Sequence, residues 1–433
     1  MLPSQDAFGV APEGLDAVAP GTVLRSRRVN VAMFGVVRQQ VSAWQLLYRS
    51  TDMDGRPEVA VTTVLVAGDA DPRLPRPLLA FQSAIDAVTE CCAPSYALCH
   101  GARALGSITQ LEWLLMIVPA LRRGWAVSVA DHGGPQGNFG APREPGYRAL
   151  DGIRAALAFR PLGLTPDAPV VLWGYSGGGM ASSWAVEMAP GYAPELDIVG
   201  AVLGSPVGDP GEVFLRLNGG LFAGFPAMVI AALRRLYPVL DRLTRDHLAE
   251  TGLPLLARAE QLPPLRTLMH LANHNLDDHL TRPLAQLWAD PELLVLLEDL
   301  RLGNNIPTCP LLVVQPMYDQ VIHRAAVDGQ VARYDRGGAE VTYIRDRLSE
   351  HFTLLALATP LSLNWLEARI AGNPQHQTGS HTVWSIALHR ASLRGYLDMA
   401  VGIARAALSW PLRSSPPPPI PAVRRGPMPR AAG

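Results

Sequence analysis

The segment Gly174-Tyr175-Ser176-Gly177-Gly178 has the composition of a turn that carries a nucleophilic serine. The apolar run Val170–Trp173 precedes it, and a small-residue helix is expected from Gly178 to Met188. Such a strand–turn–helix lifts the serine above a sheet, and glycines flank it because a Cβ would collide with the neighbouring strand and helix. The helix also points its positive end at a developing oxyanion. The alternative, a glycine-rich turn with an incidental serine, fits this context less well.

A nucleophilic serine needs a base and an orienting acid, which in this arrangement follow in the order Ser, Asp or Glu, His, after later strands. The apolar run Leu311–Val314 leads to Asp319, which is followed by an apolar pair. The run Val341–Ile344 leads to His351, directly before a predicted helix. Spacing therefore predicts Asp319 as the orienting acid and His351 as the base.

Other acids and histidines fit these roles less well. His323 follows Asp319 too closely to come from a separate loop. Asp346 could replace Asp319 but is better explained as a loop residue, and Glu350 adjoins His351, so its side chain should point elsewhere. Asp131 and His132 precede the serine in the chain, so we expect them to line the rim or the core. His376, His381 and His389 are expected to be surface residues.

The elements that position these residues alternate between short apolar runs and helical patterns, which predicts a mainly parallel sheet covered by helices. Strands are expected at Val59–Val66, Leu78–Phe81, Trp125–Ala130, Val170–Trp173, Ile198–Leu203, Leu311–Val314 and Val341–Ile344. Helices are expected at Glu112–Arg123, Ala149–Phe159, Gly178–Met188 and Phe352–Ile370. Between Ser205 and Ile306 the strand signals give way to leucine-rich helical segments, which predict an inserted cap.

Composition excludes several classes of protein. The 433 residues include 37 basic and 38 acidic side chains, so no basic excess exists for nucleic-acid binding. With 48% hydrophobic and 17% charged residues, the chain is typical of globular proteins. The four cysteines (Cys91, Cys92, Cys99, Cys309) lack zinc-ligand spacing and are too few for a disulfide framework. We expect mostly buried thiols, and neither a metal nor an organic cofactor.

Membrane and export signals are also missing from the pattern. No run reaches the roughly 18 apolar residues of a spanning helix, and the best candidate, Leu221–Leu233, stops at Arg234. The first 23 residues carry Asp6, Glu13 and Asp16 and lack the basic start and apolar core of a signal peptide. This predicts a cytoplasmic or peripherally membrane-associated protein without a transmembrane segment.

Several blocks in one order resemble the secretory lipase family of fungi and actinobacteria, the lipase A type, from about Gly21 to Gly372. The blocks are Gly21-Thr22-Val23-Leu24-Arg25, Cys92-Ala93-Pro94-Ser95-Tyr96, Gly124-Trp125 with Asp131-His132, Leu150-Asp151-Gly152-Ile153-Arg154-Ala155, the serine turn, Tyr192-Ala193-Pro194-Glu195-Leu196, Asn218-Gly219-Gly220 with Phe222-Ala223-Gly224-Phe225, and Glu350-His351 with Leu363 to Trp365. The resemblance implies an α/β-hydrolase fold with an inserted helical lid.

By this resemblance the triad also falls on Ser176, Asp319 and His351. The family's oxyanion hole uses the N–H after the nucleophile, here Gly177, and a second N–H from an Asp before the Cys-Ala-Pro-Ser block. That position is Asp86, for which an ordinary helix-start acid is nearly as good an explanation. The family is normally exported and has disulfides, whereas here the export signal and a cap cysteine to pair with Cys92 are missing.

The expected organisation follows from these boundaries: an N-terminal extension at 1–20, the first part of the core at 21–204, the cap at 205–306, the second part of the core at 307–372, a helical extension at 373–412 and a disordered Pro/Arg-rich tail at 413–433. After Asn373 the chain is expected to leave the α/β pattern. The apolar segment Trp384–Leu412 is expected either to pack on the core or to act as an amphipathic helix at a lipid surface.

Together these patterns predict a carboxylic-ester hydrolase, and the apolar, leucine-rich cap favours a triacylglycerol lipase that acts at a lipid–water interface. The cap leucines could instead only attach the cap to the core. A short-chain esterase or an acyltransferase would use the same side chains. A non-catalytic binding protein with this fold is the remaining alternative, and the presence of Ser176, Asp319 and His351 argues against it.

Overall fold

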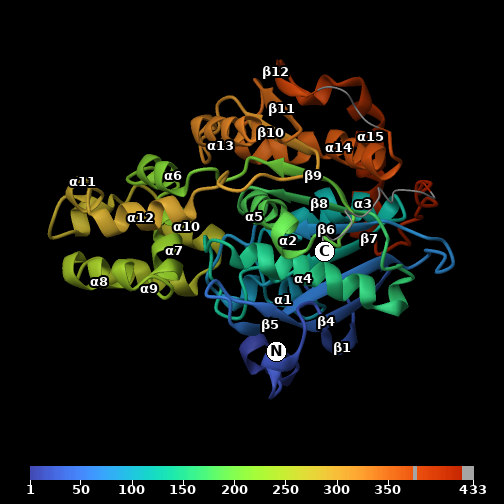
Figure 1. The fold of residues 1–433 in the computed structure, drawn as a ribbon, viewed down its shortest axis with the longest axis horizontal. Coiled ribbons are helices and arrows are strands. Elements are labelled where there is room, and N and C mark those ends of the chain that lie inside the picture. Colours follow the sequence, from blue (N-terminus) through green and yellow to red (C-terminus); the bar gives the residue numbers. More distant parts are fainter. Residues whose placement is uncertain (374–377, 422–433) are drawn as a thin grey trace, which may run out of the picture.

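A computed structural model describes residues 1–373 and 378–421. Its centre is a ten-stranded sheet in the order β1-β4-β5-β7-β6-β8-β9-β10-β11-β12 (Figure 1). The strands are β1 (Val23–Val29), β4 (Val41–Thr51), β5 (Pro57–Ala67), β6 (Leu78–Gln82), β7 (Ala126–Ala130), β8 (Val170–Tyr175), β9 (Ile198–Gly204), β10 (Leu311–Pro316), β11 (Val341–Asp346) and β12 (Gly379–Val383). A separate small hairpin joins β2 (Ala32–Met33) and β3 (Val37–Arg38).

The sheet is parallel from β7 to β12 and antiparallel from β1 through β4 and β5 to β7. Gly174 of β8 is in register with Leu203 of β9, and Val314 of β10 with Gly204. The carboxyl ends of β8, β10 and β11 therefore meet at one edge of the sheet, where ligands of such folds bind. The predicted α/β fold with a mainly parallel sheet is confirmed.

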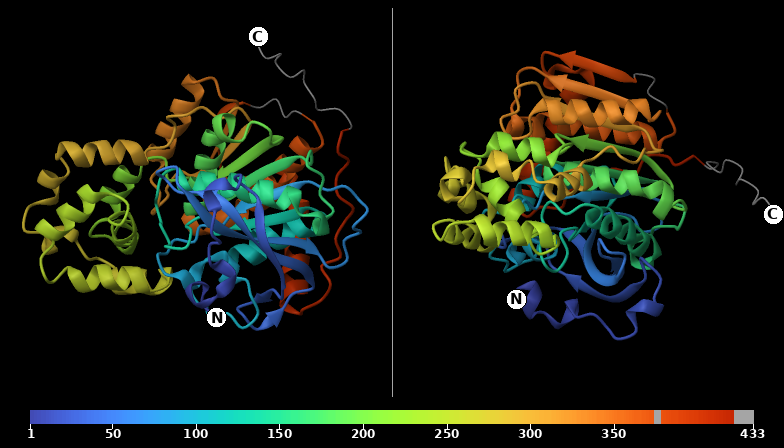
Figure 2. Two further views of the ribbon diagram at one scale, coloured as in Figure 1. Left: turned by 60° about the horizontal axis from the view of Figure 1, so that its bottom comes forward. Right: turned by 60° about the vertical axis from the view of Figure 1, so that its left-hand side comes forward.

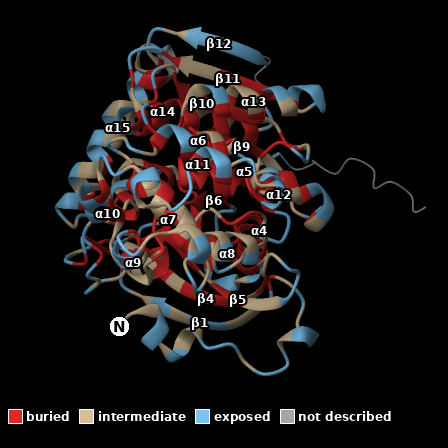
Figure 3. Cartoon of the chain, turned by 90° about the vertical axis from the view of Figure 1, so that its left-hand side faces the viewer, coloured by how far each residue is buried: buried red, intermediate tan, exposed pale blue. Residues whose placement is uncertain are grey.

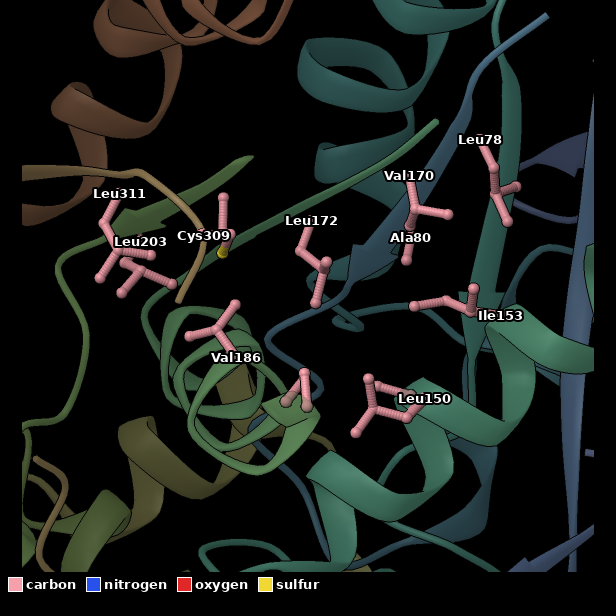
Figure 4. Packing of buried hydrophobic residues seen from close by; sticks show 14 of the residues in the cluster. Leu78, Ala80, Leu150, Ile153, Val170, Leu172, Val186, Leu203, Cys309 and Leu311 are labelled. Atoms are coloured by element: carbon pink, nitrogen blue, oxygen red, sulfur yellow. The ribbon is translucent and has the colours of Figure 1, made fainter. Parts of the chain in front are cut away.

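Helices cover both faces of the sheet (Figure 2). One apolar core joins α4 (Glu144–Ala158), α5 (Gly177–Tyr192) and α13 (Arg324–Arg336) to the strands, and Figure 4 shows its packing around Leu172 and Val186. The other core joins the sheet to three further helices, namely α3 (Val118–Arg122), α14 (His351–Ile370) and α15 (Arg390–Ala407). Short elements complete this part: α1 (Pro94–Ala97), α2 (Thr109–Glu112) and a π-helical turn (Trp113–Ile117).

A wholly helical segment lies between β9 and β10 and projects to one side of the sheet (Figures 1 and 2). We call residues 210–300 the helical insertion. Its elements are α6 (Pro210–Leu217), α7 (Gly224–Leu233), α8 (Pro238–His247), α9 (Leu253–Gln261), α10 (Pro264–Leu271), a 3-10 turn (Leu276–His279), α11 (Leu284–Leu287) and α12 (Pro291–Leu300). It has small apolar cores of its own, around Met228 and around Leu296.

The C-terminal part differs from the sequence prediction. The chain does not leave the α/β pattern after Asn373, because β12 pairs in parallel with β11 and extends the sheet. Its sequence, Gly379-Ser-His-Thr-Val, is polar because this edge strand is exposed, as Figure 3 shows, so no apolar run marks it. Within the predicted disordered tail, Ser415 N–H donates to Arg122 O at 2.7 Å and Ile420 packs on the core, and disorder there stays a prediction. Residues 422–433 lie outside the described part.

Candidate active site

Ser176 stands in a sharp turn between β8 and α5. Its backbone angles, φ 55° and ψ −120°, are strained for a residue with a Cβ. A Cβ on Gly174 would approach Gly178 O to 2.0 Å, and a Cβ on Gly178 would approach Gln82 O of β6 to 2.0 Å. Glycine is therefore required on both sides of the turn, as the sequence predicts. The turn holds the Ser176 hydroxyl at the carboxyl edge of the sheet.

His351 is the first residue of α14, directly after β11 and its loop. Glu350 caps this helix by accepting from Phe352 N–H at 3.0 Å and Thr353 N–H at 2.7 Å, so its side chain points away from the histidine ring, as predicted. The Tyr175 hydroxyl donates to His351 O at 2.6 Å. Burial raises the pKa of Tyr175 well above its usual value, so this hydroxyl stays a donor.

Asp319 follows β10 and is buried, although its neighbours Tyr318 and Gln320 are exposed. Its Oδ1 accepts from Val321 N–H at 2.8 Å and Ile322 N–H at 2.7 Å. Its Oδ2 accepts from Gln315 Nε2 at 3.2 Å and lies 2.8 Å from His351 Nδ1. Four donors thus fix the carboxylate, and two of them are backbone groups of its own loop.

The structure brings the three side chains predicted to do chemistry into one line. His351 Nε2 lies 3.0 Å from Ser176 Oγ, and His351 Nδ1 lies 2.8 Å from Asp319 Oδ2. All three residues are buried, at 7%, 3% and 4% exposure for Ser176, His351 and Asp319. A carboxylate at Nδ1 favours the tautomer whose Nε2 is free to accept a proton from the serine hydroxyl. The arrangement can therefore generate a serine nucleophile.

Gly177 and Asp86 both lie beside Ser176. A Cβ on Gly177 would come within 2.5 Å of Asp86 Oδ1, so the Asp86 carboxyl group packs directly on this residue. The Asp86 N–H donates to Ala84 O at 2.6 Å, and both Ile85 and Asp86 have positive φ, at 57° and 49°. The strained segment thus brings Asp86 to the serine, but its N–H is engaged with Ala84. Burial, and then the nearby Glu112, raises the pKa of Asp86 well above its usual value.

A buried clamp, which sequence reasoning missed, holds this segment. Glu112 of α2 accepts from Ala84 N–H at 2.9 Å and from the Ser83 hydroxyl. His132 Nε2 bonds to Ser83 O at 2.6 Å. Burial raises the pKa of Glu112 to about 7 and lowers the pKa of His132 to about 4, so His132 is neutral near pH 7 and serves as the donor. No local pattern around Glu112 could have revealed this role.

The remaining candidate residues lie apart from the serine. Asp346 is the last residue of β11 and not the loop residue that was predicted; its buried carboxylate accepts from Leu348 N–H at 2.9 Å, from Ser349 N–H at 2.8 Å and from Ile386 N–H. Asp131 accepts from Ser95 N–H at 2.8 Å and packs in the interior. Two of the other candidate histidines lie away from Ser176: His323 precedes α13 near Glu212, and His381 is exposed on β12. His376 lies outside the described residues.

A small apolar cavity of about 60 Å³ opens at Ser176, bounded by Val213, Phe214 and Val229 of the helical insertion. A second cavity of about 100 Å³ continues between the helices of the insertion, and its lining is apolar and mostly leucine. Pro210, Phe214 and Val229 border both cavities.

Within residues 1–373 and 378–421 no group of three or more His, Cys, Asp or Glu side chains could hold a metal ion. The same residues include no helix that is both long and apolar enough to span a bilayer. All four cysteines are free thiols, and two of them, Cys92 and Cys309, are buried.

Comparison with known proteins agrees with this geometry. The family model of the secretory lipases matches residues 98–378. A Mycobacterium tuberculosis protein named a probable inactive lipase is 47% identical over 96% of this chain and 93% of its own, and Lipase A of Arthroderma benhamiae is 34% identical over 86% and 80%. The closed state of Candida antarctica lipase A superposes with a TM-score of 0.82 and 25% identity, covering 97% and 99% of the two chains. The chain belongs to the secretory lipase family of α/β-hydrolases.

Proposed function

We propose that this protein is a serine hydrolase of lipid esters, with Ser176, His351 and Asp319 as its catalytic triad. Family and fold support an ester hydrolase. The observation that carries the proposal is the unbroken chain of contacts from Ser176 Oγ through both ring nitrogens of His351 to Asp319 Oδ2. Structural histidines rarely join a strained serine to a buried carboxylate in this way.

In the acylation step Ser176 Oγ attacks the ester carbonyl carbon while His351 Nε2 takes the hydroxyl proton. The carbon–oxygen bond to the alcohol then breaks, and the same proton passes from Nε2 to the departing alcohol. In deacylation water repeats the sequence on the acyl-enzyme and releases the fatty acid. Asp319 stabilises the charged imidazole and keeps its orientation in both steps.

Two groups stabilise the oxyanion in this proposal. The Gly177 N–H, at the start of α5, is the first donor, and the helix adds its positive end. Asp86 supplies the second: its N–H becomes available when the peptide turns away from Ala84, and its carboxyl group already lies against Gly177. Removing one such donor typically costs about 3 kcal/mol of transition-state stabilisation.

The helical insertion supports a substrate with an acyl chain, and we propose that residues 205–306 act as a cap. The apolar cavity at Ser176 continues into the leucine-lined cavity within the insertion, and almost no polar surface interrupts the route. The Phe222 ring lies 5.8 Å from the Phe352 ring, next to His351, so the insertion also covers the catalytic edge. A route of this kind favours long-chain acyl esters such as triacylglycerols over small esters.

A non-catalytic role is the second candidate, because one relative with 47% identity is named a probable inactive lipase. Covalent labelling by a fluorophosphonate separates the two. We expect labelling of the native protein, no labelling of Ser176→Ala, and full labelling of Ser182→Ala, a buried serine on the same helix. Absence of labelling in the native protein would contradict the catalytic proposal.

An acyl-chain series of p-nitrophenyl esters, followed by emulsified triacylglycerol, then tests the substrate class. A lipase is expected to prefer the long chains and the emulsion. A preference for acetate would favour the short-chain esterase, and product formation only with added alcohol would favour the acyltransferase.

A further inference from the structure

Helix α15 turns apolar side chains to the solvent. Its other side packs against α3 and α14. Leu393, Leu397 and Val401 follow the helical repeat along the open side, and Leu408 continues it just after the helix. These four side chains are 47% to 73% exposed. A surface helix of a globular protein normally presents a polar face to water, whereas the exposed side of α15 is mainly apolar.

The packing of α15 prevents it from rotating to bury these leucines. Gly395 and Gly402 form part of the inner side of the helix, against α14 and α3. A Cβ on Gly395 would come within 2.5 Å of Pro360 Cβ, and a Cβ on Gly402 within 2.8 Å of Arg122 Cδ. A rotated helix would have to place leucines where even a Cβ does not fit. The outward direction of Leu393, Leu397 and Val401 is therefore built into the packing.

Two exposed tryptophans flank α15 along the chain. Trp384, 67% exposed, precedes the helix, and Trp410, 53% exposed, follows it. Tryptophan is suited to the boundary between water and an acyl layer, because its ring is apolar and its N–H is polar. The Leu348 N–H donates to Trp384 O at 3.2 Å, so Trp384 lies beside the loop that leads to His351.

Arginines accompany the stripe. Arg394 is exposed on α15, the Arg347 guanidinium stacks 5.5 Å from the Trp384 ring, and the Arg405 guanidinium 5.8 Å from the Trp410 ring. Between Trp384 and Arg413 the sequence contains four arginines and one acid, Asp398. That acid forms an ion pair with Arg122 at 2.5 Å, so it does not offset the exposed arginines.

We propose that the α15 surface, consisting of Trp384, Leu393, Leu397, Val401, Leu408 and Trp410 with Arg347, Arg394 and Arg405, docks on an anionic phospholipid bilayer. The leucines and tryptophans enter the boundary between headgroups and acyl chains, and the arginines bind lipid phosphates. The charge of the surface favours a bilayer of this kind over a second copy of the chain, since two copies would bring like charges together. Docking also places Trp384, which is hydrogen-bonded to the loop that leads to His351, at the lipid.

Vesicle flotation of the full chain tests the proposal without any turnover, in a Ser176→Ala background that leaves the lipid intact. The vesicles contain either equal parts of phosphatidylglycerol and phosphatidylcholine or phosphatidylcholine alone. We expect binding to the anionic vesicles that weakens as salt is added. Leu393→Glu/Leu397→Glu should lower this binding at least tenfold, and Arg347→Gln/Arg394→Gln should remove most of the preference for anionic lipid.

Leu294→Glu is the matched control, because Leu294 is a half-exposed leucine on a helix of the helical insertion. It should bind as the parent does, and circular dichroism should show that all variants are folded. Three results would overturn the proposal: no flotation of the parent protein, equal flotation of Leu393→Glu/Leu397→Glu and parent, or loss of flotation in Leu294→Glu alone. A parent that sediments as a dimer, is split by Leu393→Glu/Leu397→Glu and never floats would assign the surface to a second copy instead. Flotation measures binding alone, in a variant without the proposed nucleophile. A protein that fails to float therefore contradicts docking only, whereas a native protein that is not labelled by the fluorophosphonate contradicts catalysis only.

Discussion

Replacement of Asp319 by Asn changes one atom of a carboxylate that has four donors around it. If the Asn oxygen keeps the two backbone donors, Val321 N–H and Ile322 N–H, then its NH₂ group faces Gln315 Nε2 and His351 Nδ1. The opposite orientation would oppose two buried backbone N–H groups, at about 1–3 kcal/mol each. The first orientation is therefore preferred, and Gln315 cannot adapt freely because its Nε2 also donates to Ile322 O at 2.9 Å.

The preferred orientation of the new amide in Asp319→Asn changes the tautomer of His351. An NH₂ group at Nδ1 requires Nδ1 to accept, so the proton moves to Nε2, which then donates to Ser176 Oγ and cannot take its proton. Loss of the productive tautomer in an Asp-His-Ser arrangement lowers kcat by about 10⁴-fold, equivalent to roughly 5 kcal/mol at 1.36 kcal/mol per factor of ten. We expect a loss of this size in Asp319→Asn, with KM changed little because no substrate contact is removed.

The assay is kcat and KM for a p-nitrophenyl ester, together with the rate of fluorophosphonate labelling. Asp346→Asn is the matched control, because Asp346 is an equally buried carboxylate at the end of the adjacent strand, with only backbone donors. Both variants should lower the free energy of unfolding by about 1–3 kcal/mol. Only Asp319→Asn should lose turnover.

Retention of more than a tenth of the native kcat by folded Asp319→Asn would refute this reasoning. A loss in Asp346→Asn as large as that in Asp319→Asn would do the same, because the defect would then come from general loosening of the loops at the sheet edge.

Three further predictions concern the turn, the clamp and the acyl route. Gly178→Ala should fail to fold or melt far below the native protein, because its Cβ would meet Gln82 O at 2.0 Å, whereas Gly191→Ala on the same helix, with open space around it, should melt at or slightly above the native temperature. Burial raises the pKa of Glu112 from its ordinary value of 4.5 to about 7 in the folded protein. Its contribution to stability is therefore complete below the ordinary value and is lost as the pH rises through about 7. Glu112→Gln should flatten this decline in the free energy of unfolding, measured in urea between pH 5 and pH 8. Val229→Trp should lower kcat/KM for long acyl chains at least tenfold and leave butyrate nearly unchanged, since Val229 borders both cavities; equal losses for both esters would show that the chain takes another route.

Strands in the middle of the sheet could be predicted closely because each is a short apolar run that ends in turn residues. The run Val170–Trp173, for example, became β8 with two more residues, and Leu311–Val314 became β10 with two more. β12 could not be predicted, because an exposed edge strand needs no apolar side chains. Its place in the sheet depends on pairing with β11, which is a tertiary property.

For the site, chain order was sufficient to indicate Ser176, Asp319 and His351, which the structure brings within hydrogen-bonding distance. The support around them was not predictable. Glu112 lies 29 residues from Ser83 in the sequence, and its role depends on how α2 packs beneath that segment. Asp86 was indicated only by family resemblance, and no sequence pattern reports that its N–H bonds to Ala84 O.

The placement of the helical insertion between two paired strands affects how this chain folds. β9 and β10 pair in parallel, yet the whole insertion separates them. During synthesis β9 can pair with β8, but its other, apolar edge stays open until the ribosome has released the insertion and β10. An open strand edge can pair with other nascent chains. Pairing of β9 with β10 is slow because the whole insertion separates the two strands in the sequence. Recombinant yield should therefore depend on slow translation, low temperature and chaperone supply more than on the stability of the finished protein.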